Sequence, residues 1–101
     1  MTEDITVTRD DEGSRYEIRL GDTLAGFAEF ELRSGEILFT HTEVDPAFQG
    51  RGLAGTLAAD ALKDAAASGD TIVPYCPYIA AYLKKHEVEG ADIRWPQVPG
   101  A

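Results

Sequence analysis

Gln49-Gly50-Arg51-Gly52-Leu53-Ala54 decides the fold, because it joins a strand-like pattern to a helix-like one. Residues 36–44 before it form a strand-like run, and residues 53–68 after it carry apolar side chains at helical spacing. Two glycines and a small residue at a helix start leave backbone N–H groups pointing outward, and such groups bind phosphate. The stretch therefore predicts a phosphate-bearing ligand where the strand meets the helix.

The first half of the chain predicts antiparallel strands. The expected strands are residues 5–8, 15–20, 23–32 and 36–44. Residues 15–20 alternate charged and apolar side chains, which is the period of a half-buried strand. Gly21-Asp22 is typical of a tight hairpin turn, and Gly26 indicates a bulge in the third strand. Short connections of this kind imply a meander.

The second half predicts helices and parallel strands. The expected elements are a helix over residues 53–68, a strand starting at 71–73, a helix from Pro77 to about Lys85 or His86, and a strand over 90–95 with Ile93 and Trp95 packed inward. The apolar stripe of the first helix is Leu53, Leu57, Ala58, Ala61, Leu62 and Ala65. We expect a single α/β domain with a mainly antiparallel sheet, a βαβ crossover and two helices, its core over residues 5–95 and a frayed tail at 96–101.

Composition limits the function. The 101 residues carry a net charge of −9, which argues against a broad electrostatic grip on nucleic acid or an anionic membrane. An anionic ligand must then be held by local backbone groups. Cys76 is the one cysteine, so no disulfide within the chain is expected, and the acidic N-terminus lacks a signal-peptide pattern. We expect a cytoplasmic protein without a metal, as a monomer or a weak dimer.

Two common nucleotide motifs fit poorly. Gly50-x-Gly52-x-x-Gly55 satisfies the dinucleotide-binding spacing, but that fold needs a strand running almost directly into the first glycine. Here Pro46 and a loop intervene, and the next strand ends at Cys76 without an acidic residue for the ribose. A P-loop would need Gly-Lys-Ser/Thr, which is absent. NAD binding stays open as the least favoured alternative.

Four segments resemble the GNAT superfamily of acetyl-CoA-dependent N-acyltransferases. Residues 49–54 match its Q/R-x-x-G-x-G/A signature, and Tyr82-Leu83-Lys84 resembles its Y-x-K segment. With His-Thr-Glu-Val at residues 41–44 and Val-Pro-x-Cys-Pro-Tyr at 73–78, the chain is similar to the minimal YjdJ-type branch. The resemblance implies central strands that splay apart to admit acetyl-CoA. It implies that Val44 lies along the pantetheine arm and that the pyrophosphate is held by Gln49, Gly50, Arg51, Gly52, Leu53 and Ala54.

The strand before the loop carries candidate catalytic residues, although the region where many GNAT members have a catalytic glutamate is apolar here, at Ile37-Leu38-Phe39. Acetyl transfer needs an amine that loses a proton and a stabilised oxyanion. A backbone N–H near Val44 is the expected oxyanion donor. Strand alternation puts His41 and Glu43 on one face and Thr42 and Val44 on the other. His41 is a candidate base or else a structural histidine of the sheet, and Glu43 is a candidate base or else a solvated carboxylate.

Two further residues lie beside the expected thioester. Cys76 is a candidate nucleophile, a proton donor to the CoA thiolate, or a buried packing thiol. Tyr82 matches the family's thiolate-protonating tyrosine, or it is a core aromatic four residues after Tyr78. The acceptor is an unidentified amine, and the absence of long N-terminal helices suits a protein or peptide. A non-catalytic acyl-CoA-binding or interaction module with the same fold is the alternative.

Overall fold

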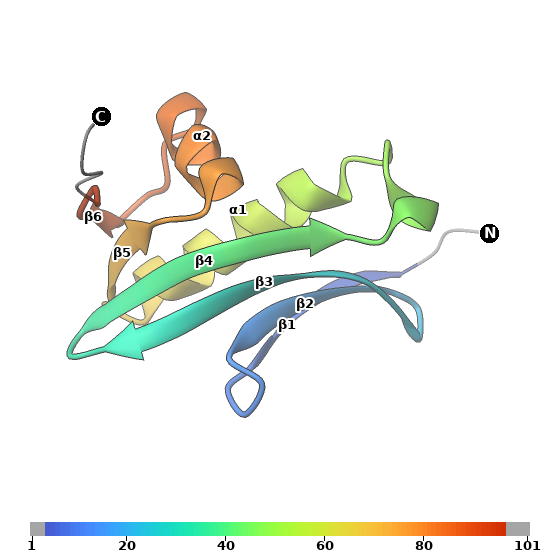
Figure 1. The fold of residues 1–101 in the computed structure, drawn as a ribbon, viewed down its shortest axis with the longest axis horizontal. Helices are drawn as coiled ribbons and strands as arrows, with labels where there is room; N and C mark the ends of the chain where they lie inside the picture. The colour runs from blue at the N-terminus through green and yellow to red at the C-terminus, as the bar shows by residue number, and fades with distance from the viewer. Residues whose placement is uncertain (1–3, 97–101) are drawn as a thin grey trace.

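The computed structural model describes residues 4–96, which form a six-stranded sheet and two helices (Figure 1). The elements are β1 (Ile5–Asp10), β2 (Arg15–Leu20), β3 (Thr23–Arg33), β4 (Glu36–Val44), the short 3₁₀ helix η1 (Pro46–Phe48), α1 (Leu53–Ala67), β5 (Thr71–Pro74), α2 (Pro77–Lys85) and β6 (Asp92–Ile93). The strand order is β1-β2-β3-β4-β5-β6. The pairs from β1 to β4 are antiparallel, whereas β4, β5 and β6 run parallel. The predicted mixed sheet with a βαβ crossover is confirmed.

Both helices cover the same face of the sheet. The crossovers β4-α1-β5 and β5-α2-β6 step in the same direction across the sheet. Because such crossovers are right-handed, they place both helices on one side. Helix α1 packs against β1 to β5, and α2 packs against β4, β5 and α1. Figure 1 looks onto the other face, which no helix of the described residues covers.

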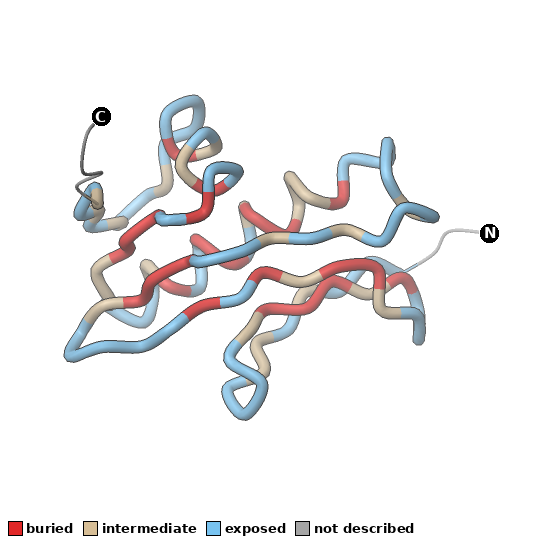
Figure 2. Tube along the Cα trace, viewed as in Figure 1, coloured by how far each residue is buried: buried red, intermediate tan, exposed pale blue. Residues whose placement is uncertain are grey.

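The core lies between α1 and the inner face of the sheet (Figure 2). The predicted stripe of α1 is confirmed, since all of its residues are buried. Tyr16 of β2 is also buried, and its hydroxyl donates a hydrogen bond to Asp64 at 2.7 Å, which ties the sheet to α1. Ile93 packs against the core as predicted. Trp95 does not: it is 45% exposed, and Lys84 Nζ lies 5.7 Å from its ring centroid.

Strand ends differ from the prediction only where local turns intervene. Strands β2 and β4 have the predicted bounds, and β1 extends two residues further. Strand β6 is short because Ala91 N–H donates to the Val88 carbonyl in a turn, with Gly90 at a φ of 76°. The expected irregularity at Gly26 is confirmed, since the β2–β3 register shifts there. A Cβ on Gly26 would lie 2.6 Å from the carbonyl oxygen of Glu43, so β3 and β4 approach closely at a glycine.

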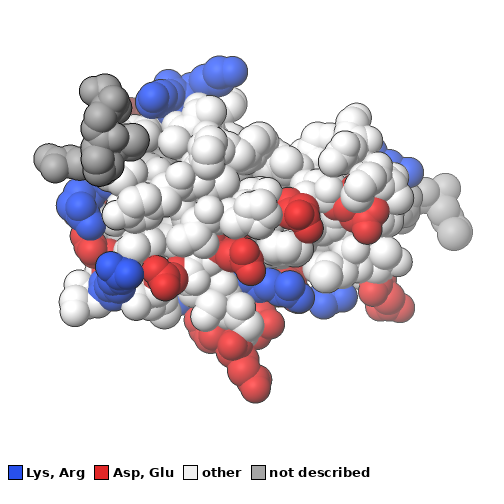
Figure 3. Space-filling view, viewed as in Figure 1, with Lys and Arg blue, Asp and Glu red and all other residues white. Residues whose placement is uncertain are grey.

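The uncovered face carries acidic and basic side chains that pair with one another (Figure 3). Glu17 is buried and accepts hydrogen bonds from Arg19 and Arg15 at 2.9 Å each. These bonds, that of Arg19 foremost, hold the pKa of Glu17 below its usual value. At the other end of the sheet, Arg94 pairs with Glu36 at 2.6 Å. Much of the charge on this face is therefore locally compensated.

The sheet opens between β4 and β5. The two strands pair only from Glu36 to Phe39, and the Phe39 carbonyl accepts both Tyr75 N–H at 3.0 Å and Cys76 N–H at 2.8 Å. Beyond this point α2 begins, whereas β4 runs on to Val44 without β5 beside it. The predicted splay of the central strands is therefore present, and its inner end lies at Phe39.

Candidate functional site

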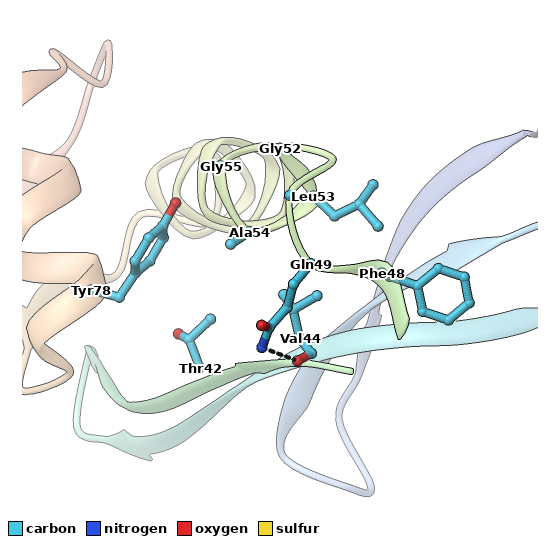
Figure 4. A pocket seen from close by; sticks show the side chains of 10 residues that line it. Thr42, Val44, Phe48, Gln49, Gly52, Leu53, Ala54, Gly55 and Tyr78 are labelled. Carbon is cyan, nitrogen blue, oxygen red and sulfur yellow. Dashed lines mark hydrogen bonds between the residues drawn. The ribbon is translucent and has the colours of Figure 1, made fainter. Parts of the chain in front are cut away.

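A pocket of about 310 Å³ lies at the carboxyl end of β4, between the strand and the start of α1 (Figure 4). It is lined by Thr42, Val44, Phe48, Gln49, Gly50, Gly52, Leu53, Ala54, Gly55 and Tyr78. These include every predicted cofactor-binding residue except Arg51. The guanidinium of Arg51 lies 5.6 Å from the ring centroid of Phe48, so it stands beside the pocket. The structure thus gathers the glycine-rich stretch around one cavity.

The loop before α1 is fixed by its own hydrogen bonds. Asp45 Oδ1 accepts the N–H of Ala47 at 2.9 Å and starts η1. The side-chain amide of Gln49 donates to the Val44 carbonyl at 3.3 Å, which ties the loop back to β4. These two contacts hold the loop against the end of β4. The loop is therefore a shaped wall of the pocket.

Two glycines give the loop its conformation. Gly50 and Gly52 have φ values of 86° and 75°, a region that side chains disfavour. Gly52 is the N-cap of α1 and supplies no side-chain acceptor to the first turn. The leading N–H groups of a helix lack intrahelical partners and carry the positive end of the helix dipole. An anion beside Gly52 would accept hydrogen bonds from these N–H groups, as the predicted phosphate-bearing ligand requires.

The free edge of β4 supplies further backbone groups. Asp45 N–H donates to the Ala25 carbonyl at 2.8 Å. This bond shows which residues near the end of β4 direct their N–H groups toward β3. Because bonded and non-bonded positions alternate, the backbone N–H groups of Thr42 and Val44 turn away from β3 toward the gap. An extended ligand with amide groups can pair with such an edge. The structure therefore presents backbone donors where an oxyanion donor near Val44 is expected.

Cys76 lies at the inner end of this arrangement. Its side chain is buried, and Sγ donates a hydrogen bond to Thr42 Oγ1 at 3.4 Å. Thr42 lines the pocket, so the thiol is one side chain removed from the cavity. Cys76 is also the N-cap of α2, which begins at Pro77. The sequence placed Cys76 near the site but gave no sign of its contact with Thr42.

His41 lies on the other face of β4. Its ring centroid is 6.3 Å from that of Phe27, and its Nε2 atom is 3.6 Å from Glu43 Oε1. The predicted alternation is confirmed: His41 and Glu43 share the uncovered face, whereas Thr42 and Val44 line the pocket. His41 and Cys76 therefore lie on opposite sides of β4, and neither side chain lines the pocket.

The two tyrosines of α2 differ in position. Tyr78 lines the pocket, and its hydroxyl lies 3.8 Å from where a Cβ on Gly55 would be. Tyr82 stands one turn further along, outside the pocket, and stacks on His86 with ring centroids 4.3 Å apart. Sequence reasoning chose Tyr82 by its match to Y-x-K. The available signal for Tyr78 was its place in the first turn of α2, nearest to the strand gap.

Within residues 4–96, no group of three or more His, Cys, Asp or Glu side chains is placed to hold a metal ion. Over the same residues, no helix is long and apolar enough to cross a membrane.

Comparison with known proteins identifies one family. A family model described as GCN5-related N-acetyl-transferase, the name that GNAT abbreviates, matches residues 15–93. The match takes in β2 to β6, and so includes the pocket, Cys76 and both tyrosines. It does not distinguish the YjdJ-type branch, which stays a prediction. No curated protein matches the chain.

Proposed function

Because the chain belongs to the GCN5-related N-acetyltransferase family, we propose that it binds acetyl-CoA at the end of β4 and transfers the acetyl group to an amine. The observation that carries the proposal is the parting of β4 from β5 beyond Phe39, beside a helix that starts at Gly52. A thioester arm needs an open strand edge, and a pyrophosphate needs free N–H groups. Both features border the same pocket.

The proposed ligand lies along the pocket in one direction. The pyrophosphate sits on the loop N–H groups from Gly50 to Ala54, where the α1 dipole favours negative charge. The pantetheine arm follows the free edge of β4 past Val44 and Thr42. The thioester then lies near the Thr42–Cys76 contact, at the inner end of the gap. Tyr78 forms the opposite wall, so we assign it, in place of Tyr82, as the tyrosine that touches this arm.

The chemistry requires the amine to enter from a free side. The uncovered face of the sheet offers that approach, and His41 lies there on the splayed part of β4. We therefore keep His41 as the proposed base for an amine that arrives from this face. The amine gives a proton to His41 as its nitrogen bonds to the thioester carbon, and the Thr42 N–H, which faces the gap beside the thioester, stabilises the oxyanion. The C–S bond then breaks, and the released thiolate takes up a proton, which balances the one that His41 removes.

Isothermal titration with acetyl-CoA, followed by CoA-release assays over a panel of amines and peptides, tests the proposal. We expect saturable binding and release of CoA with at least one amine. Absence of binding at about 1 mM ligand would contradict the proposal, since a cellular co-substrate site should be tighter than that. Binding without release over the whole panel would instead favour a non-catalytic acyl-CoA-binding module.

The role of Cys76 is tested separately. Intact-protein mass spectrometry after incubation with acetyl-CoA, without an amine, detects an acetyl group on the protein. Its presence in the wild type and loss in Cys76→Ala support a covalent acetyl-cysteine route. Full turnover by Cys76→Ala excludes any catalytic use of the thiol. Thr42→Val serves as a companion variant, because it removes the hydroxyl that contacts Sγ while keeping the shape of the side chain.

A further inference from the structure

The uncovered sheet face carries an uncompensated negative charge beside the gap. Elsewhere on this face the arginines form ion pairs with carboxylates, namely Arg15–Glu17, Arg19–Glu17, Arg33–Glu31 and Arg94–Glu36. By contrast, Glu29, Glu43 and Asp45 form no ion pair with a lysine or an arginine within the described residues. Glu29 is the register partner of His41, and Glu43 follows on the same face of β4. This part of the face is therefore complementary to a cation.

A cavity of about 140 Å³ lies at the end of the same strip. Its lining includes Gly26, Phe27, Glu43 and Asp45. Phe27 and Glu43 are direct register partners on β3 and β4, so their side chains share the uncovered face. Asp45 Oδ1 accepts the N–H of Ala47, which leaves the second carboxylate oxygen for a ligand. We call this cavity the β3–β4 cavity.

The β3–β4 cavity combines two carboxylates with an aromatic ring. Carboxylates attract a cation through their charge, and the face of an aromatic ring attracts one through its quadrupole. The ring of Phe27 already has one such contact, since the guanidinium of Arg15 lies 5.0 Å from its centroid. Arg15 is itself paired with Glu17 at 2.6 Å, so it does not neutralise Glu43 or Asp45. The volume of the cavity suits a primary ammonium group.

The β3–β4 cavity lies close to the proposed base. His41 and Glu43 are two residues apart on one face of β4, a separation of about 7 Å along a strand. The ring of Phe27 bridges this interval, because it lines the cavity and its centroid is 6.3 Å from that of His41. A chain of about four methylene groups is long enough to join an amine at His41 to an ammonium in the cavity.

We propose that the acceptor is an aliphatic diamine, of which one amine reacts beside His41 and the other binds as an ammonium ion in the β3–β4 cavity. This inference rests on the proposed function, because it names the class of amine that receives the acetyl group. The methylene chain lies on the ring of Phe27 and needs no hydrogen-bond partner. An extended peptide fits less well, since the main-chain groups of β3 and β4 are paired with each other and the free edge of β4 is assigned to the pantetheine arm.

CoA-release kinetics with two amines of similar length test the inference. Putrescine is compared with aminobutanol, in which a hydroxyl replaces the second amine. We expect the wild type to prefer putrescine about tenfold in kcat/KM, chiefly through KM, because only putrescine carries the second charge. Glu43→Gln and Asp45→Asn each remove one charge and keep the side-chain shape, and Asp45→Asn also keeps an oxygen for the Ala47 N–H. Each should reduce the preference to about threefold or less.

Glu31→Gln is the matched control, since Glu31 is paired with Arg33 beside the part of β4 that β5 covers. It should keep the full preference for putrescine. Isothermal titration of putrescine into the CoA complex adds a readout that does not depend on turnover, and Glu43→Gln should weaken this binding about tenfold.

Three outcomes overturn the inference and leave the proposed function intact. The first is equal kcat/KM for putrescine and aminobutanol in the wild type. The second is an equal loss with both amines in Glu43→Gln, which would mean that Glu43 acts on the reacting amine. The third is a lysine-containing peptide that reacts faster than putrescine and is unaffected by Glu43→Gln. Absence of acetyl-CoA binding removes the proposed function and this inference together.

Discussion

Gly52 combines a left-handed backbone with the position that caps α1. A Cβ at this residue has open space around it, so the cost of Gly52→Ala arises from φ and not from a clash. We expect a loss of about 1 kcal/mol in unfolding free energy. Because the N–H groups beside it would turn, acetyl-CoA affinity should fall about tenfold. Urea unfolding and isothermal titration measure the two effects.

Gly69 provides the matched control. It has a φ of 82°, also has open space for a Cβ, and follows the opposite end of α1. Gly69→Ala should carry a similar stability cost with unchanged acetyl-CoA affinity. If both variants lost affinity equally, the loop at Gly52 would have no special part in binding.

Glu17 makes stability depend on pH. Its pKa is lowered in the folded protein, chiefly by the hydrogen bond from Arg19. Because the folded pKa lies below the ordinary value of 4.5, the ionised Glu17 stabilises the fold above that pH. The contribution fades as the pH falls through the lower folded pKa. Glu17→Gln should therefore destabilise by about 1 kcal/mol at about pH 7 and by much less at about pH 3.

Urea unfolding at the two pH values measures this difference. Glu31→Gln is the comparison, since Glu31 and its partner Arg33 are largely exposed and their contact is 3.4 Å long. It should change stability little at either pH. A Glu17→Gln effect of equal size at both pH values would contradict the ionic explanation.

At the scale of elements, the alternation of apolar and polar residues predicted the strand bounds well where paired strands follow one another in the chain. β2 and β4 keep their predicted ends because alternation and tight turns define them. The bounds of the last strand and the inward position of Trp95 were wrong, since the turn at Gly90 and the contact with Lys84 depend on how α2 packs. The position of Tyr82 outside the pocket could not be predicted for the same reason. Their spacing puts Tyr78 and Tyr82 on one stripe of α2. Only the packing of α2 against α1 decides that Tyr78 lines the pocket and that Tyr82 stacks on His86 instead.

Helix α1 should contribute stability mainly through its buried stripe. Leu57 is fully buried in the core between α1 and the sheet. Leu57→Ala is expected to cost about 3 kcal/mol, because it removes apolar contacts and leaves a cavity. Leu32 is 53% exposed, so Leu32→Ala should cost less than about 1 kcal/mol. Urea unfolding compares the two, and similar losses would mean that α1 does not form the principal core contact.

At the scale of the whole molecule, the two faces of the sheet carry different features. The helices, the glycine-rich loop and the pocket lie together, whereas the other sheet face carries paired charges and His41. The sequence could predict the loop, since its spacing is local. It could not predict that both helices share a face, because that follows from the direction of two successive crossovers. Under the proposed function, this division lets acetyl-CoA lie on one face while the amine approaches from the other.

Ligand binding should stabilise the whole molecule. A ligand that binds only the folded state at a hundredfold excess over its Kd adds about 2.7 kcal/mol to the unfolding free energy. For a chain of this size, that corresponds to a rise in Tm of about 10 °C. Acetyl-CoA should produce such a rise, measured by differential scanning fluorimetry over a concentration series. Gly52→Ala should shift the curve to higher ligand concentrations.

NAD at the same concentrations should leave Tm unchanged. A loop with the 3₁₀ helix η1 separates β4 from the glycines, and no acidic residue follows β5 at Tyr75-Cys76, whereas a dinucleotide site needs a direct connection and an acidic residue. An equal rise with NAD would restore the dinucleotide interpretation of Gly50-x-Gly52-x-x-Gly55, and the assignment of the loop to the pyrophosphate of CoA would then fail.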